Sequence, residues 1–258
     1  MKRVRVLYHD NCFDGVSSAA VFSRFYRAHI DAAAEIEYEG LTHKAGQSIS
    51  DDLFGPEENV IVDFKYAASG KLTWWFDHHE SAFLSAEDEA HFRRDHSGHK
   101  FHDPSYKSCT KFIAHVTRTK FQCPMPDLDD LIYWADIIDG AQFPDAKTAV
   151  ELKEPAMRLM LVIEASHSPD LIHRIIREVQ HKSLAEVIND PEIHSTFERL
   201  YEGLSGREIL QRFEDRKDLR RHVEHAASDH REIFIEIDTV AAVYDRRQFL
   251  NRGDRRRS

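Results

Sequence analysis

Short apolar segments recur along the first part of the chain, and helix-like segments separate several of them. Four have the length and the apolar or aromatic content of strands: residues 5–8, 35–38, 59–63 and 73–76. Between the first two, residues 17–28 carry Ala, Val and Phe at helical spacing. Strands that alternate with helices predict an α/β domain whose mostly parallel sheet is flanked by helices.

The pattern changes after about residue 107, where helical periodicity replaces the strands. Residues 111–119 and 128–138 have apolar side chains at positions i, i+3 and i+4, and a long region rich in Glu, Arg and Leu follows. Near the C-terminus, residues 232–237 alternate charged and apolar side chains, and 240–244 form a second short strand-like run. We therefore predict three parts, namely an α/β domain at 1–145, a helical linker at 146–230, and a short C-terminal α/β unit at 231–258 with two strands and a basic tail.

The composition narrows the classes of protein to which the chain can belong. No apolar run approaches the roughly 20 residues needed to span a bilayer, so no membrane partner is expected. Three cysteines, Cys12, Cys109 and Cys123, do not make a disulfide framework, which predicts a cytoplasmic location. The net charge of −10 argues against long nucleic acid as a partner, because many phosphate contacts need many Lys and Arg side chains.

One acid and two histidines, Asp77, His78 and His79, follow the apolar run at 72–76. Ionisable side chains at the end of a buried strand are costly in a core and useful at a metal. The carboxyl ends of strands are also where open α/β sheets bind their ligands. This triplet is therefore the first candidate for a functional site, with a strand-end turn of satisfied histidines as the alternative.

Three further segments carry similar side chains. His9 and Asp14 lie where the first strand meets the first helix, Asp63 ends an apolar run, and Asp136 and Asp139 lie one helical turn apart. Each alone is explained as a helix N-cap or a solvated helix end. Together with the triplet they point to one edge of the sheet, where parallel strands end. Mixed His and Asp ligands suit Mn²⁺ or Mg²⁺ rather than a structural zinc, and they suffice for two cations.

The order of these segments resembles the DHH phosphoesterase family over residues 1–145. The matching segments are His9 with Asp14-Gly15, Val62-Asp63, Asp77-His78-His79, the small-residue segment Lys107-Ser108-Cys109-Thr110, and Asp139-Gly140-Ala141-Gln142-Phe143. The family includes single-strand exonucleases, oligoribonucleotide and phosphoadenosine phosphatases, cyclic-dinucleotide phosphodiesterases and family II pyrophosphatases. An ordered set of four such motifs, with the small-residue segment in its expected place, is quite specific.

The resemblance implies a hydrolase that cleaves a phosphate ester or phosphodiester of a short nucleotide. It implies two divalent cations, Mn²⁺ or else Mg²⁺, and a hydroxide between them that attacks phosphorus. The metal ligands that it implies are His9, Asp14, Asp63 as the bridging residue, His78 and Asp139, with Asp136 as a further candidate.

The resemblance also implies roles for residues beside the cations. His79 would donate to a phosphoryl oxygen or protonate the leaving group. Asp77 would orient a histidine by accepting from its ring N–H. Ser108 and Lys107 are candidates for contact with the substrate phosphate.

Two departures from the family pattern leave alternatives open. Cys12 stands where most members have an acid, so Asp10, Cys12 or water could complete one metal position. Many members also carry a C-terminal substrate-binding module that ends in Gly-Gly-Gly-His. The sequence has no such motif. Two alternatives remain open for the short C-terminal unit: it is the start of such a module, or its two strands dock on the α/β domain.

Two other functions remain as alternatives to the nucleotide phosphoesterase. One is a pyrophosphatase or polyphosphatase with the same fold. The other is a catalytically impaired regulatory protein that binds metal or nucleotide. The helical region at 146–230 is compatible with a linker, a support for a lid or a homodimer surface, and its sequence does not choose among them.

Overall fold

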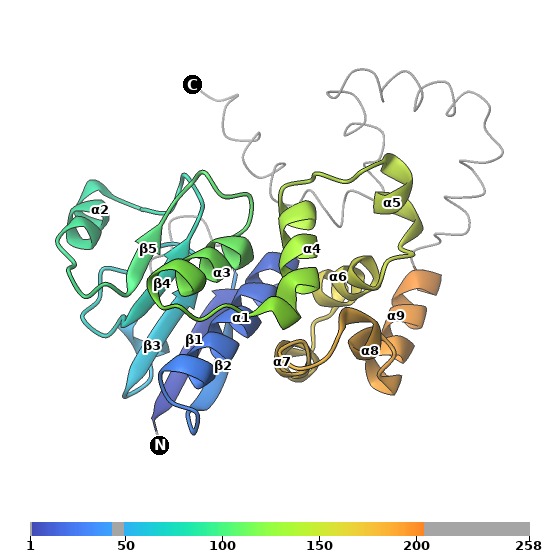
Figure 1. Ribbon diagram of the computed structural model, residues 1–258, viewed down its shortest axis with the longest axis horizontal. Helices are drawn as coiled ribbons and strands as arrows, with labels where there is room; N and C mark the ends of the chain where they lie inside the picture. The colour runs from blue at the N-terminus through green and yellow to red at the C-terminus, as the bar shows by residue number, and fades with distance from the viewer. Residues whose placement is uncertain (1, 43–48, 204–258) are drawn as a thin grey trace. The chain divides into compact units, whose positions relative to one another are not determined.

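Five parallel strands form one sheet in the computed structural model of the protein, which describes residues 2–42 and 49–203. The strand order is β2-β1-β3-β4-β5, and every pairing is parallel (Figure 1). The strands are β1 (Arg3–His9), β2 (Glu35–Leu41), β3 (Glu58–Val62), β4 (Trp74–Asp77) and β5 (Lys100–His102). The predicted α/β fold with a parallel sheet and flanking helices is therefore confirmed.

Helices make up most of the remaining described chain. They are α1 (Phe13–His29), α2 (Ala86–Arg93), α3 (Cys109–Lys120), α4 (Asp129–Asp139), α5 (Ala146–Glu151), α6 (Pro155–Ala165), α7 (Pro169–Glu178), α8 (Leu184–Ile188) and α9 (Pro191–Gly203), with short 3₁₀ turns at η1 (Asp51–Leu53) and η2 (Pro126–Leu128). Serine side chains cap the first turns of several of them, as Ser108 does for α3 by accepting from the Lys111 amide. Within the described residues, no helix is both long and apolar enough to cross a bilayer.

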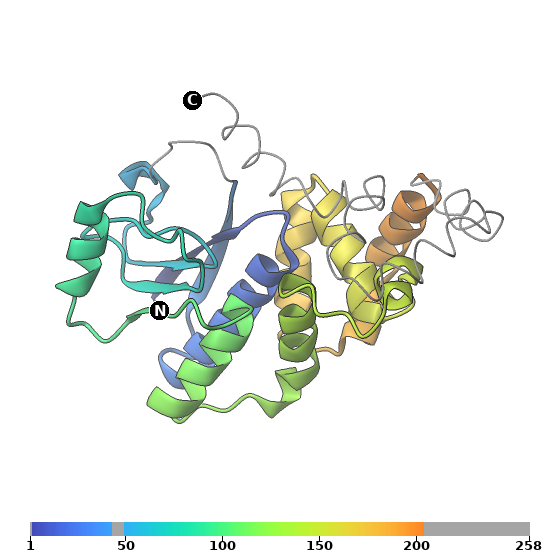
Figure 2. The ribbon, with the colours of Figure 1, turned by 90° about the horizontal axis from the view of Figure 1, so that it is seen from above.

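The two faces of the sheet bury different aromatic groups, because successive side chains of a strand point to opposite faces. On one face Trp74 packs against Phe22 and Phe25 of α1, with ring centroids 5.8 Å apart in both pairs. On the other face Trp75 packs against Tyr66 at 4.8 Å and against Phe92 of α2 at 5.1 Å. Figure 2 shows α1 and α3 on one side of the sheet and α2 on the other. Both faces are thus covered, as a parallel sheet requires.

Helix α1 joins the sheet to the helical region that follows it. It packs against β1 and β3, and also against α3, α4, α6 and α7. The chain up to His194 accordingly groups into one compact unit, and a second unit starts at Ser195, within α9. The boundary predicted at residue 145 therefore falls inside the first unit, because α6 and α7 pack on α1 instead of forming a separate linker.

The part of the predicted helical region that the structure describes consists of helices α5 to α9, which are separated by short breaks that include the one predicted near residues 189–190. The two C-terminal strands predicted at 232–237 and 240–244 lie outside the described residues, as does the whole unit predicted at 231–258.

Candidate metal centre

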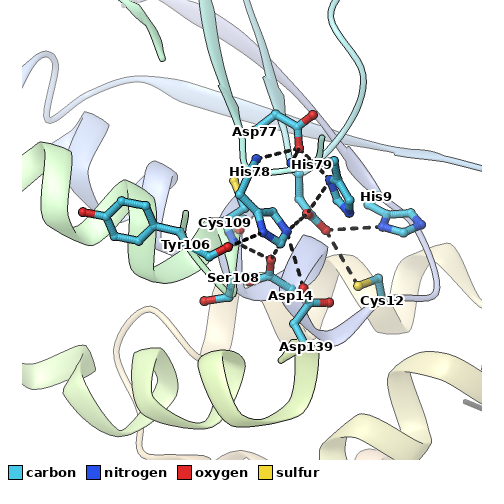
Figure 3. Close-up of polar contacts among 12 residues, drawn as sticks. His9, Cys12, Asp14, Asp77, His78, His79, Tyr106, Ser108, Cys109 and Asp139 are labelled. Atoms are coloured by element: carbon cyan, nitrogen blue, oxygen red, sulfur yellow. Dashed lines mark hydrogen bonds and ion pairs between the residues drawn. The ribbon is translucent and has the colours of Figure 1, made fainter. Parts of the chain in front are cut away.

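Three neighbouring strands bring the predicted site residues to one edge of the sheet. The register pairs Tyr8 with Val62 and Val62 with Phe76. The residues that come next in β1, β3 and β4 are His9, Asp63 and Asp77, so these follow one another across the sheet edge. Figure 3 shows the resulting cluster, to which α1 and α4 add residues from below.

Asp63 lies at the centre of the cluster, with a left-handed backbone at φ 54°. Its Oδ2 is 3.3 Å from His9 Nδ1 and 3.7 Å from Cys12 Sγ. Its Oδ1 is 3.4 Å from His78 Nε2 and 3.8 Å from His79 Nδ1. The side chain is fully buried, and Oδ1 makes no hydrogen bond with any described residue. One carboxylate therefore faces two groups of possible metal ligands, and its strained conformation is of the kind that functional sites retain.

Asp14 is held by the first turn of α3. Its two carboxylate oxygens accept the backbone N–H groups of Cys109 at 2.7 Å and Thr110 at 3.0 Å. A helix N-terminus is a natural site for an anion, and here the protein's own carboxylate occupies it. Asp14 Oδ2 also lies 3.7 Å from His78 Nε2. The contact with α3 therefore fixes one oxygen of Asp14 beside the histidine.

His78 connects Asp63, Asp14 and Asp139. Its Nδ1 lies 3.1 Å from the Tyr106 carbonyl oxygen, to which it donates as N–H. Its Nε2 is 3.4 Å from Oδ2 of Asp139, the last residue of α4, and makes no hydrogen bond within the described chain. A histidine whose Nδ1 donates to a carbonyl presents Nε2 as a metal ligand, because the hydrogen bond fixes both the tautomer and the orientation of the ring.

His79 is oriented by Asp77. Its Nδ1 donates to Asp77 Oδ1 at 2.7 Å, and the same oxygen accepts the amide N–H groups of His78 at 2.9 Å and His79 at 3.3 Å. His102 donates from Nε2 to the His79 carbonyl at 2.8 Å. The His79 side chain is 30% exposed, against 8% for His78. His79 is therefore held in place and is also more accessible than His78.

The pKa values in the metal-free protein reflect this crowding of charge. Burial lowers the pKa of His78, but Asp63, Asp14 and Asp139 outweigh it and raise that pKa to about 10. Burial together with Asp63 and Asp139 raises the pKa of Asp14 well above its usual range. Burial opposes ionisation of Asp63 too, yet His78 and His9 hold its pKa well below the ordinary value. Protonated histidines thus balance the carboxylates where no cation does.

Three overlapping groups of side chains have ligand atoms within 4.8 Å of one another. Among the described residues they are His9 with Cys12 and Asp63, Asp63 with His78 and His79, and Asp14 with His78 and Asp139. The groups share Asp63 and His78, and each of these two residues has a buried polar atom without a hydrogen-bond partner among the described residues. Nitrogen and oxygen donors arranged in this way fit divalent cations, and the shared carboxylate fits a pair of them.

Four other residues predicted for the site lie outside these groups, and one of them, Asp77, holds His79. Asp136 accepts from Lys111 Nζ at 2.5 Å and from Ser108 Oγ at 3.5 Å, so its carboxylate faces α3. Ser108 is buried and caps α3, and Lys107 is exposed beside Gly140. The structure thus brings together His9, Asp14, Asp63, His78, His79, Asp77 and Asp139, and it does not bring Asp136 to the cluster.

Some contributors to the centre have no signal in the sequence. The amides of Cys109 and Thr110 and the carbonyl of Tyr106 act through the backbone, which every residue type offers. The choice between Asp10 and Cys12 also needed the structure. Asp10 packs over Gly40, where an added Cβ would lie 2.7 Å from its carboxylate carbon, whereas Cys12 faces Asp63.

In comparisons with known proteins, the sequence matches no protein-family model and no curated protein. What the protein does is therefore inferred from the chemistry of this edge of the sheet. Three features define that chemistry. Asp63 is a buried carboxylate shared by two groups of possible ligands, the Nδ1 of His78 is held by the Tyr106 carbonyl, and the partly exposed His79 lies beside them. Such a centre can hold divalent cations next to an accessible proton donor.

Proposed function

We propose that the protein is a divalent-cation-dependent phosphoesterase that hydrolyses a phosphate ester or phosphodiester of a short nucleotide. The observation that carries the proposal is the pair Asp63 Oδ1 and His78 Nε2. Both atoms are buried, lie 3.4 Å apart and lack a hydrogen bond among the described residues. In the metal-free protein a protonated His78 faces the Asp63 carboxylate across this distance, and a bound cation would take the place of that proton between the two atoms.

The residues present fit two cations. His9 and Asp63 would hold one, and Asp14, His78 and Asp139, with Asp63 shared, would hold the other. Mn²⁺ is the first choice and Mg²⁺ the second, because the ligands mix imidazoles with carboxylates. When bound, a pair of such cations lowers the pKa of water and neutralises charge on a phosphoryl group. The convergence of the four motifs supports the proposed membership in the DHH phosphoesterase family.

His79 would be the proton donor to the substrate. Its Nδ1 is engaged with Asp77, which leaves Nε2 to donate to a phosphoryl oxygen or to the departing oxygen. Burial lowers the pKa of His79, but Asp77 and Asp63 outweigh it and raise that pKa to about 9 in the metal-free protein. In the metal-free protein the His79 ring is therefore protonated at neutral pH.

A short substrate is favoured by the charge of the chain. The net charge of −10 opposes a long polyanion, which needs many cationic side chains along its path. Bound cations would supply positive charge at the cluster itself, and that suffices for one or two phosphates.

The test is hydrolysis of a chromogenic phosphodiester by metal-stripped protein to which Mn²⁺ is added back. We expect turnover that depends on the cation and that falls by about 100-fold or more in His78→Ala. His96→Ala is the matched control, because His96 is exposed in the loop between α2 and β5. Wild-type turnover in His78→Ala contradicts the proposal.

A substrate panel separates the proposal from its alternatives. It contains short oligoribonucleotides, phosphoadenosine phosphate, cyclic dinucleotides and pyrophosphate. Turnover of pyrophosphate alone supports the pyrophosphatase alternative. Stoichiometric Mn²⁺ binding without turnover of any member supports a regulatory protein that binds metal or nucleotide.

A further inference from the structure

The two sides of the Asp63 carboxylate offer different donor atoms. On one side lie His9 Nδ1 and Cys12 Sγ, at 3.3 Å and 3.7 Å from Oδ2. On the other side, Asp14, His78 and Asp139 form a group of two carboxylates and one imidazole. Only the first group contains sulfur, so the two positions are chemically unequal.

The backbone directs the Cys12 thiol into the cluster. Cys12 is the N-cap residue of α1, a position where Ser, Thr, Asp or Asn normally accepts a helix amide. In the described chain the Cys12 side chain makes no such capping bond. Its carbonyl accepts the Val16 amide at 3.1 Å, and the preceding Asn11 is left-handed at φ 51°. The side chain is 3% exposed, so the sulfur is buried beside Asp63.

We propose that the group His9, Cys12 and Asp63 is a position for a borderline cation such as Fe²⁺, Co²⁺ or Zn²⁺, bound through the Cys12 thiolate. The group Asp14, His78 and Asp139 takes Mn²⁺ or Mg²⁺. Thiolate sulfur selects softer ions and carboxylate oxygen selects harder ones, so two different metals share the Asp63 bridge.

Binding at the sulfur position releases one proton. The S–H bond of Cys12 breaks, its proton goes to solvent, and the sulfur electron pair forms the bond to the cation. No electron is transferred and no oxidant is needed. The inference rests on the metal centre of the proposed function and does not require hydrolysis.

Cys123 is the internal control. It is half-buried beyond the C-terminal end of α3. Serine at this position removes a sulfur from the protein without removing one from the proposed site. Cys109 is not used as a control, because its backbone N–H donates to Asp14 at 2.7 Å.

The experiment is an anaerobic titration of the metal-stripped full chain with Co²⁺, followed by near-ultraviolet absorption and by the number of ions bound. We expect a sulfur-to-cobalt charge-transfer band in the wild type and in Cys123→Ser. In Cys12→Ser the band is lost, and one of the two cobalt ions binds about 10-fold or more weakly. Cys12→Asp, an oxygen donor at the same place, shifts the preference of that position from Co²⁺ towards Mn²⁺.

A second measurement needs no variant. Zinc-edge X-ray absorption of the wild-type protein loaded with one equivalent of Zn²⁺ is expected to show sulfur at about 2.3 Å. Cobalt binding without a sulfur band, or a band that survives in Cys12→Ser, overturns the inference and leaves the metal centre standing. A wild-type protein that binds no cobalt overturns the metal centre and the inference together.

Discussion

Acidic side chains at the two ends of the sheet pair with different types of residue. At the amino end, Glu58 accepts from Lys2 Nζ at 2.5 Å and from Trp74 Nε1 at 3.3 Å, and Glu57 accepts from Arg3. At the carboxyl end, the ion pairs of Asp14, Asp63 and Asp77 with described residues are all with histidines.

The difference lies in the side chains that balance the acids at the two ends of the same sheet. Lysine and arginine carry their charge at every physiological pH, so the amino end is balanced by the protein itself. The histidines at the carboxyl end carry a charge only while they are protonated, and a cation that displaces the proton can bind to the same nitrogen. Under the proposed function, a bound cation would take over this part of the charge balance from the protons of the histidines.

The largest expected effect comes from adding one methyl group at the carboxyl end. A Cβ at Gly15 would lie 2.1 Å from the His9 carbonyl oxygen, so Gly15→Ala must push α1 away from β1. We expect a loss of about 3 kcal/mol in the free energy of unfolding, measured by urea denaturation. Gly70→Ala is the control near the other end, where no atom lies within 4 Å of the added Cβ. Equal stability of the two variants contradicts the close packing that positions His9.

Removal of cations is expected to have the next largest effect. A ligand at 100 times its dissociation constant stabilises the folded state by about 2.7 kcal/mol. For a chain of this size Mn²⁺ should therefore raise the melting temperature by about 5–10 °C, and a chelator should reverse it. Asp63→Asn should abolish the shift, because it alters the shared ligand, whereas Glu58→Gln should keep it. A shift that persists in Asp63→Asn places the cation elsewhere.

Asp77→Asn tests the support of His79. The amide oxygen can still accept the backbone N–H groups, but the negative charge beside the ring is gone. We expect turnover to fall by about 10–100-fold with little change in stability. The pKa of His79, about 9 in the metal-free protein, should fall towards its ordinary value, as followed by NMR. Asp95→Asn, at a carboxylate 2.8 Å from Lys100 Nζ, should leave both measurements unchanged.

Glu58→Gln is expected to have the smallest effect, and that effect depends on pH. Burial alone would raise the pKa of Glu58, but hydrogen bonds from Lys2 and Trp74 outweigh it and lower the pKa below 4.5. The ion pair therefore contributes stability above pH 4.5, and the contribution is lost as pH falls through the folded-state pKa. The variant should be less stable by about 1 kcal/mol at pH 7, since Lys2 is half exposed. Denaturation curves at pH 7 and pH 3 should show the difference shrinking.

The sequence alone predicts the strands that are buried on both faces of the sheet. Strands β3 and β4 are continuous apolar runs, so they were predicted to within about a residue. Strand β5 was not predicted, because Phe101 is its only buried residue. Helix α2 was not predicted either: it buries no residue, and its best local signal is the Ser85 cap.

The sequence predicts the part of the candidate site that lies at the ends of the strands. It does not predict the part that depends on how helices pack against the sheet and against each other. His9, Asp63 and His78 meet because parallel strands end at one edge, which a sequence pattern can indicate. Asp136 and Asp139 lie about one turn apart on α4, so the sequence places both on one face of the helix. In the structure Asp136 pairs with Lys111, and only Asp139 contacts the cluster. The position of Cys12 beside Asp63 likewise depends on how α1 docks at the end of β1.

Asp139 is synthesised later than the other residues of the cluster, because α4 follows the strands in the sequence. The ribosome completes β1, β3 and β4 before it adds α4, so the histidines and Asp63 emerge well ahead of Asp139. A nascent chain that has already formed the sheet still lacks one donor of its Asp14, His78 and Asp139 group. High-affinity cation capture should therefore mark a late step of folding, and a bound paramagnetic or luminescent ion would time the docking of α4.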